Sequence, residues 1–463
     1  MNRISVCILA MAIAACPVLA DETSDALALA QQAVESLAIV AVSMENELGQ
    51  RTFGGQAVCI DAQQGIFMTM SLPAGLKASD IKECKLILPS REGNRVDAEF
   101  LGIDSATQLG FVKAKQAHGA KAISFKKTSQ LDPGQQVVSA GLMTSMAGFP
   151  SYLGVAYVSS NLRLPDRLIQ VTGGTLTGAC SPVLTTDGKV VGLVGRQLFM
   201  AYQTSTQRGP VGIRLMGVDK TVFFWPVEEF AAVLSNIPTG GQASRPSWIG
   251  VGQFAGVSEE MAEVFGVEEP DQVVKIESVV PGYVGDKAGL KSGDVITQYN
   301  GQPLEVLANA ALTRQNFVRQ ITRLSAGTEV NLTVLRSRKP IQVTVKTEPL
   351  PATPSDAPRY VNRVLGMMVR QRVPLETDMD PTAVEGLVVL GVGENSDAAQ
   401  AGLRAGDVIT QVNGQPVTQV EDFQKLLEPS LKAAAEGSGQ WPIIKVSRGE
   451  GTLDMQLRIS PRQ

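Results

Sequence analysis

Short apolar runs, separated by glycine, proline, aspartate and serine, dominate residues 25–235. They include GGQAVCID, CKLILPS, QQVVSAG and KVVGLVG. Runs of this length with turn-forming residues between them indicate β-strands, and their spacing predicts an all-β barrel or sandwich. A short amphipathic helix is predicted at 26–37. A second is predicted after Trp225-Pro226, because proline suits the first position of a helix.

Two segments rich in proline, glycine and serine interrupt the rest of the chain. They cover residues 236–247 (NIPTGGQASRPS) and 347–358 (TEPLPATPSDAP), and both are predicted to be exposed linkers. The sequence therefore predicts three folded parts. Their bounds are 25–235, 246–348 and 359–462.

The last two parts repeat each other. Residues 288–304 read AGLKSGDVITQYNGQPL and residues 401–417 read AGLRAGDVITQVNGQPV, which agree at 13 of 17 positions. A match this dense indicates one structural unit used twice. In each copy a strand-like DVITQ leads into Asn-Gly, which suits a tight turn between strands, and a further strand-like run follows.

Residues 1–20 have the pattern of an export signal. Arg3 precedes an uncharged run over residues 4–15, which is shorter than the roughly 20 residues of a membrane span. Val18-Leu19-Ala20 offers a cleavage site, whereas Ile13-Ala14-Ala15-Cys16 resembles a bacterial lipobox that would leave a lipid anchor on Cys16. Both interpretations place the protein outside the cytoplasm, in the periplasm or cell envelope.

Beyond residue 20 the chain has three cysteines, Cys59, Cys84 and Cys180. An odd number leaves at least one thiol unpaired. Cys59 and Cys84 both lie in strand-like runs. A disulfide between them and a pair of buried free thiols are equally open interpretations.

Composition excludes several classes of function. The 41 basic and 45 acidic residues give a net charge of −4, so a nucleic-acid partner is not expected. Apolar residues at 44% and charged residues at 19% exclude a mostly disordered chain. With His118 as its one histidine, the sequence cannot supply a multi-histidine metal site, and it shows no nucleotide-binding loop. We therefore predict no metal and no other cofactor.

The repeated motif AGL-x-x-GDVI-x-x-NG resembles that of bacterial PDZ domains, which implies two α+β domains that capture peptides. A PDZ domain adds an extended peptide to a sheet edge, and a short apolar-Gly-apolar loop holds the peptide's terminal carboxylate. About 40 residues before each motif lie the matching stretches. They are Trp248, Ile249, Gly250 and Val251 in the first copy, and Val364, Leu365, Gly366 and Met367 in the second. An ordinary strand with a glycine bulge is the alternative interpretation, and Trp248 could instead pack the linker.

Four fragments of the first part, in order, resemble HtrA-type (Deg) serine proteases. They are residues 54–58 (GGQAV), 104–113 (DSATQLGFVK), 134–138 (GQQVV) and 187–193 (DGKVVGL). The resemblance implies a mainly β fold in which a chymotrypsin-like double β-barrel precedes the two PDZ domains.

Catalysis in that family needs a serine, a histidine and an aspartate. The histidine stretch T-N-x-H falls on residues 69–72, which places Leu72 at the general base, and T-D-L falls on 107–109, which places Gln108 at the carboxylate. The nucleophile stretch falls on residues 178–184 and places Cys180, or by the downstream count Ala179, at the serine. Leucine accepts no proton and glutamine carries no charge, so the resemblance implies a pseudoprotease without catalytic residues.

Three hypotheses follow. The first is an exported, inactive HtrA-like protein that binds peptide termini or unfolded segments, as a scaffold, chaperone-like protein or regulator in envelope protein quality control. The second is a Cys180-dependent endopeptidase, for which only His118 is available as a histidine base. The third is an inactive subunit that modulates an active homologue. Homo-oligomers are also considered, although residues 21–52 lack the aromatic residues through which HtrA proteins form trimers.

Overall fold

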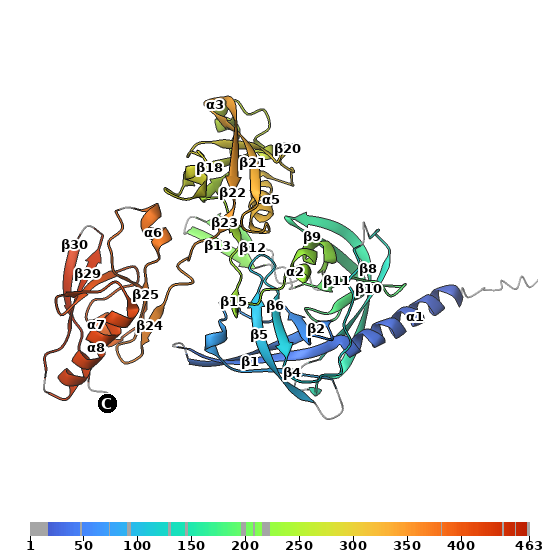
Figure 1. The fold of residues 1–463 in the computed structure, drawn as a ribbon, viewed down its shortest axis with the longest axis horizontal. Helices are drawn as coiled ribbons and strands as arrows, with labels where there is room; N and C mark the ends of the chain where they lie inside the picture. Colours follow the sequence, from blue (N-terminus) through green and yellow to red (C-terminus); the bar gives the residue numbers. More distant parts are fainter. Residues whose placement is uncertain are drawn as a thin grey trace, which may run out of the picture.

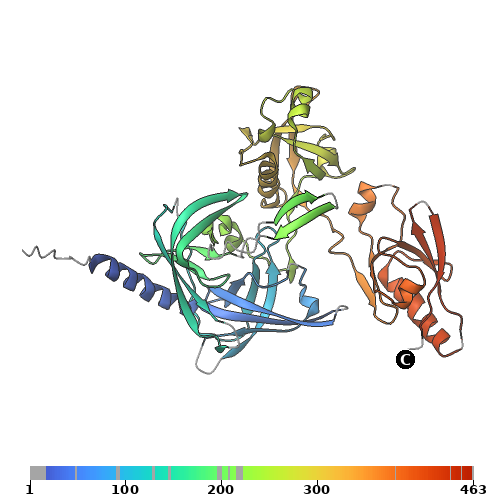
Figure 2. The same ribbon diagram turned by 180° about the vertical axis from the view of Figure 1, so that it is seen from behind.

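In the computed structural model, a double β-barrel is followed by two smaller domains. In the views of Figures 1 and 2 the first stands above the barrels and the second lies beside them, at the end away from helix α1. Residues 1–16 lie outside the described structure, and with them most of the predicted export signal and Cys16. The described residues are 17–46, 49–73, 75–89, 94–127, 131–143, 147–195, 201–206, 209–214, 223–380, 382–437, 439–449 and 451–460.

Six strands close the first barrel. β1 pairs with β2 and β4, and the ring closes through β3, β6 and β5, while the short β15 (Gln242–Ala243) adds to β5 in parallel. The barrel strands are β1 (Leu37–Asn46), β2 (Gly49–Asp61), β3 (Ile66–Thr69), β4 (Ile81–Ile87), β5 (Arg95–Ile103) and β6 (Gly110–Ala114), with the 3-10 turn η2 (Ala78–Asp80) before β4.

Six further strands close the second barrel, in the order β10-β11-β14-β9-β8-β7. They are β7 (Gln136–Leu142), β8 (Ser151–Leu164), β9 (Asp166–Thr175), β10 (Pro182–Thr185), β11 (Val190–Val194) and β14 (Phe223–Pro226). Between β11 and β14, the hairpin β12 (Ala201–Thr206) and β13 (Gly209–Arg214) forms a separate two-stranded sheet. The two closed barrels and the two domains after them confirm the predicted mainly β fold.

Strands such as β3, β7 and β11 read as nearly continuous apolar runs because both of their faces are buried. Along β3, Phe67 packs inside the first barrel, while Met68 packs in a cluster formed by residues of both barrels. Along β7, Val137 lies inside the second barrel and Val138 in the shared cluster. Successive side chains of a strand point to opposite faces, so each of these strands contributes to two cores.

Two helices near the barrels were expected from the sequence. The first, α1 (Pro17–Ala33), begins and ends earlier than the predicted 26–37, and the 3-10 turn η1 (Val34–Ser36) follows it. The second was predicted after Pro226, where the structure has the 3-10 turn η4 (Val227–Glu229) and the short helix α2 (Ala231–Ser235). Ala26 and Ala30 of α1 are buried in the cluster shared by the barrels.

The two remaining domains each pack helices on an antiparallel sheet. In the first, the sheet order is β17-β18-β19-β21-β22, and β16 pairs separately with β23. Its elements are β16 (Ser247–Trp248), β17 (Val251–Ala255), α3 (Glu259–Phe265), η5 (Pro270–Gln272), β18 (Val274–Val279), α4 (Val284–Lys287), β19 (Val295–Tyr299), β20 (Gln302–Pro303), α5 (Ala310–Thr322), β21 (Glu329–Arg336), β22 (Lys339–Lys346) and β23 (Glu348–Pro349).

The second domain has the same plan with one addition, a strand that precedes the others, and its sheet order is β24-β25-β26-β27-β29-β30. Its elements are β24 (Arg359–Asn362), β25 (Met367–Gln371), α6 (Pro374–Met379), β26 (Leu387–Val392), α7 (Asp397–Gln400), β27 (Val408–Val412), β28 (Gln415–Pro416), α8 (Val420–Ala435), β29 (Ile443–Arg448) and β30 (Gly451–Gln456).

All three cysteines of the described chain are free and buried. Of the two interpretations of Cys59 and Cys84, the structure therefore has the buried thiols. Burial raises the pKa of each of these two thiols to about 11. Both are neutral and poorly reactive at physiological pH.

Candidate functional site

Leu72, at the position that the resemblance assigns to a general base, follows β3 and lies in the core of the first barrel. Its side chain is 4% exposed. A Cβ atom at Gly110, where β6 begins, would lie 3.0 Å from Leu72 Cδ1, so the leucine covers the start of that strand. A leucine side chain has no hydrogen-bonding atom, and it can neither take a proton nor position one.

Gln108, which the resemblance places at the orienting carboxylate, lies in a tight loop before β6. Asp104 closes this loop, because its Oδ2 accepts hydrogen bonds from the N–H (2.7 Å) and the hydroxyl (2.6 Å) of Thr107. Gln108 has a positive φ of 60°, and its Nε2 donates to the carbonyl of Ser105 at 2.7 Å. The amide is therefore engaged within its own loop.

Cys180, which the resemblance places at the nucleophile with Ala179 as the alternative, is fully buried where the two barrels meet. Its N–H donates to the carbonyl of Val194 at 2.8 Å, and Sγ lies 3.5 Å from the carbonyl oxygen of Met68, to which it donates. Burial raises the pKa of the Cys180 thiol to about 12. A thiol needs a lowered pKa or an adjacent base to act as a nucleophile at neutral pH, and these contacts supply neither.

A buried glutamine joins the barrels beside Cys180. Gln56 of β2 donates from Nε2 to the hydroxyl of Ser181 (2.8 Å) and accepts at Oε1 from the N–H of Leu142 on β7 (2.7 Å). The carbonyl of Gln56 accepts the hydroxyl of Thr69 at 2.8 Å. No motif marks Gln56 in the sequence, where its one signal is a polar side chain within an apolar run.

His118 lies apart from these residues. Its Nδ1 accepts the N–H of Ala120 at 3.1 Å, and its ring packs edge-on against Phe67, with 5.2 Å between the ring centroids. Phe67 points into the first barrel, whereas its neighbour Met68 faces the cluster that contains Cys180. In the described structure no hydrogen bond joins His118 to Cys180, and the observed contacts give His118 a local packing role.

The first predicted carboxylate loop turns sharply at Gly250. This residue has a φ of 76°, and the backbone of Gly285 lies so close that no side chain would fit there. Ile249 is fully buried, and within the described structure the N–H groups of Ile249 and Gly250 donate to no protein acceptor. Trp248 has a structural role, because its Nε1 donates to the carbonyl of Val251 (2.7 Å) and its ring packs edge-on against Tyr283.

The second predicted loop has the same glycine conformation, with a φ of 70° at Gly366, but its donors are occupied. The N–H of Leu365 donates to the side-chain Oδ1 of Asn362, and the N–H of Gly366 donates to the carbonyl of the same residue, both at 2.9 Å. Val364 is 45% exposed, and Met367 begins β25. The two loops therefore differ in which backbone donors are free.

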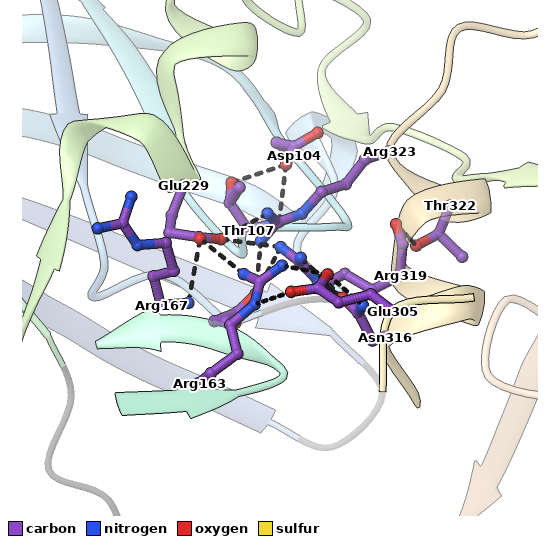
Figure 3. Close-up of polar contacts among 11 residues, drawn as sticks. Asp104, Thr107, Arg163, Arg167, Glu229, Glu305, Asn316, Arg319, Thr322 and Arg323 are labelled. Carbon is purple, nitrogen blue, oxygen red and sulfur yellow. Dashed lines mark hydrogen bonds and ion pairs between the residues drawn. The ribbon is translucent and has the colours of Figure 1, made fainter. Parts of the chain in front are cut away.

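A cluster of charged residues joins the second barrel to helix α5 of the domain that follows (Figure 3). Glu229 of η4 is at its centre, with Oε2 2.9 Å from Nη1 of Arg319 and 2.8 Å from Nη1 of Arg323. Arg323 also reaches Asp166 of β9 at 2.9 Å. Burial favours the neutral form of Glu229. Hydrogen bonds from Arg323 and the N–H of Arg167, together with the positive charges of Arg319 and Arg323, outweigh burial and hold the pKa of Glu229 below its usual value.

A second arm of this cluster runs through Arg163 on β8. Arg163 donates to both oxygens of Glu305, at 3.2 and 2.9 Å, and lies 3.4 Å from Oε1 of Glu229. Asn316 of α5 also donates to Glu305, at 2.9 Å. One side of α5 is thus held against the barrel by several charge-assisted hydrogen bonds.

Two closed six-stranded barrels followed by sheet-and-helix domains define the class of this protein as a chymotrypsin-like double barrel with PDZ domains. A family model described as a PDZ domain matches residues 275–336 and 388–432. A solved structure described as a serine-to-alanine variant of the HtrA-type protease AlgW with decapeptide is similar in fold, with a TM-score of 0.53. It is 18% identical, over 72% of this chain and 99% of that one.

Curated relatives agree with this class. A probable periplasmic serine endoprotease, DegP-like, from Marinomonas sp. (strain MWYL1) is 29% identical over 71% of this chain and 66% of its own length. A protein of the same description from Rhizobium meliloti (strain 1021) is 27% identical over 80% of this chain and 69% of its own length. The chain thus spans about two thirds of the length of these relatives. It is a homologue of the HtrA/DegP-like serine proteases with PDZ domains.

No helix among the described residues is long and apolar enough to cross a membrane. Within the same residues, no group of three or more histidine, cysteine, aspartate or glutamate side chains could hold a metal ion.

Proposed function

We propose that this protein is an exported, catalytically inactive HtrA-like protein that binds peptide termini through a PDZ domain. The main support for the proposed loss of catalysis comes from the side chains of Leu72 and Cys180. The base position is an aliphatic side chain in the barrel core, and the nucleophile position is a fully buried thiol with a raised pKa. Neither residue supplies what acyl transfer needs.

The buried glutamine contributes to the same proposal. Gln56 bonds to Ser181 and to the N–H of Leu142, and so it ties the strands of the two barrels together beside Cys180. The N–H of Cys180, which an oxyanion site at the nucleophile position would use, donates to the carbonyl of Val194 at 2.8 Å. This junction serves as packing between the barrels, and the barrels act as a scaffold.

Peptide binding is proposed from the loop that precedes β17. The N–H groups of Ile249 and Gly250 have no protein acceptor in the described structure. Buried backbone donors almost always have a partner. The terminal carboxylate of a peptide would accept hydrogen bonds from these two N–H groups. The adjacent edge of β17 offers further backbone groups to an extended peptide.

The proposed cellular location is supported by the relatives, which are named as periplasmic. We place this chain in the periplasm or cell envelope, with residues 1–20 as its signal, or with Cys16 as a lipid anchor. We propose domain bounds of 25–235, 246–348 and 359–462. The role is that of a scaffold, a chaperone-like protein or a regulator in envelope protein quality control, where an active homologue is a natural partner.

Cleavage of fluorescent casein by the purified protein, beside the Cys180→Ala variant, tests the loss of catalysis. We expect no turnover above buffer for either protein. Turnover that disappears in the variant would show a cysteine endopeptidase and overturn the proposal.

Peptide binding is tested with a fluorescent decapeptide that ends in an apolar residue with a free carboxylate. We expect binding that is lost when the same peptide is amidated, and lost in Gly250→Val, whose side chain would meet the backbone of Gly285. Gly282→Val is the matched control, because Gly282 also has a positive φ but has open space around it. Equal binding of the free and amidated peptides would contradict a carboxylate site.

A further inference from the structure

β25 has a strand neighbour on each edge. It pairs with β26 on one side and with β24 on the other, in the register Arg359↔Arg370 to Asn362↔Met367. β17, which follows the equivalent glycine in the first PDZ domain, is the edge strand of its sheet and pairs only with β18 in the described structure. Since a PDZ domain adds its peptide to this edge, β24 takes the peptide's position in the second domain.

The side chains of β24 hold it against helix α8. The Tyr360 ring packs edge-on against Phe423 of α8, with 5.9 Å between centroids, and Tyr360 is 9% exposed. Its hydroxyl donates to Glu428 of the same helix at 3.0 Å and accepts from Asn362 Nδ2 at 2.9 Å. β24 therefore lies between β25 and α8, with an aromatic anchor as a bound peptide would have.

Asn362 lies where the C-terminal residue of a bound peptide would lie. Its side-chain and backbone oxygens accept the N–H groups of Leu365 and Gly366, the donors that a peptide carboxylate would otherwise use in this loop. The equivalent donors of the first domain, on Ile249 and Gly250, have no protein acceptor in the described structure. The two copies of the repeat thus differ in the state of their peptide position.

We propose that β24 is a built-in ligand of the second PDZ domain. Residues 359–362 fill its peptide position, so the native chain takes a peptide terminus only at the first domain, and the second becomes receptive when β24 leaves. Only the receptive role of the first domain rests on the proposed function. The occupancy of the second domain by β24 does not depend on the proposed function and is tested separately.

Hydrogen–deuterium exchange on the full chain tests the occupancy without a ligand. We expect every amide of Met367–Gln371 to be protected, because both edges of β25 are paired, whereas Val251–Ala255 should contain fast-exchanging amides on the free edge of β17. Fast exchange along one edge of β25, comparable with that of β17, would overturn the inference.

The Tyr360→Ala variant, which removes the anchor, should release β24 while α8 and β25 remain folded. We expect exchange across 359–362 and 367–371 to rise by about tenfold or more, with the first domain unchanged. Tyr360→Phe is the matched control, because it keeps the ring against Phe423 and loses only the hydroxyl.

A peptide added in trans gives the second measurement. The probe is fluorescent, amidated APRYVN, the sequence of residues 357–362. We expect it to bind Tyr360→Ala at least about tenfold more tightly than the native chain, where the tethered strand competes with it. Equal binding to both proteins would overturn the inference. Because the probe has no free carboxylate, this result does not depend on the proposed terminus binding by the first domain.

Discussion

The carboxylate of Asp294 accepts a two-pronged pair of hydrogen bonds from Arg336, with Nε and Nη2 each at 2.7 Å from an oxygen. The second PDZ domain has the same arrangement between Asp407 and Arg448, also at 2.7 Å. In both copies the arginine donates in addition to the carbonyl of the glycine in the AGL motif, Gly289 or Gly402. The aspartate of the repeated Gly-Asp thus fixes the turn before a central strand to the end of a later strand.

Asp294→Asn should destabilise the first PDZ domain. Asp294 is 1% exposed, and the substitution leaves Arg336 with a neutral partner that accepts fewer hydrogen bonds. We expect a loss of ~2–3 kcal/mol in the free energy of unfolding, measured by denaturant titration of the full chain. Asp271→Asn, at an exposed position, is the control and should leave the unfolding midpoint unchanged. An equal effect of both substitutions would contradict the role of the pair.

Acid should weaken the second PDZ domain through Asp407. Burial raises the pKa of this carboxyl, but hydrogen bonds from Arg448 and from the N–H of Arg404 outweigh burial and place its pKa below the usual value. The stabilising contribution is therefore complete above the unfolded pKa of about 4 and is lost as the pH falls through the lower folded value. Thermal unfolding of the native chain and of Asp407→Asn between pH 7 and pH 2 would measure this, since the variant should lack that part of the acid dependence.

Much of the architecture could be predicted from local sequence, because a strand buried on both faces and a repeated motif each leave a pattern in consecutive residues. The partner of Asp294 could not be predicted in this way, since Arg336 lies 42 positions away and only the folded sheet brings the two together. The same holds for Gln56 and Ser181, which are 125 positions apart. The filling of the peptide position in the second PDZ domain could not be predicted either, because the segment that fills it, β24, lies outside the repeated motif.

Removing the glutamine that bridges the barrels should cost stability. Gln56→Leu leaves the N–H of Leu142 without its acceptor and the hydroxyl of Ser181 without its donor, both in a buried region. We expect a loss of ~1–3 kcal/mol in the free energy of unfolding. Gln116→Leu, on the exposed surface, serves as control. A barrel as stable as the native one in Gln56→Leu would show that water or repacking replaces this bridge.

Cys180 should be inert in the folded protein. Burial raises the pKa of this thiol to about 12, so it is neutral at pH 7, and the side chain is also fully buried. We expect a thiol reagent such as DTNB to label Cys180 only after unfolding, measured as the difference between the native chain and Cys180→Ala. Rapid labelling of native Cys180 at neutral pH would indicate an activated thiolate and favour the endopeptidase hypothesis.

The charged cluster around Glu229 should decide whether the first PDZ domain stays docked on the second barrel. Glu229→Gln removes the negative charge that faces both Arg319 and Arg323, and we expect docking to weaken by ~2–4 kcal/mol because these two arginines then share only Asp166. Faster hydrogen–deuterium exchange in α5, together with a larger radius of gyration in solution scattering, would measure the release. Glu99→Gln, an exposed substitution on β5, is the matched control. If α5 exchanges equally in both variants, the domain is held by apolar packing and not by this cluster.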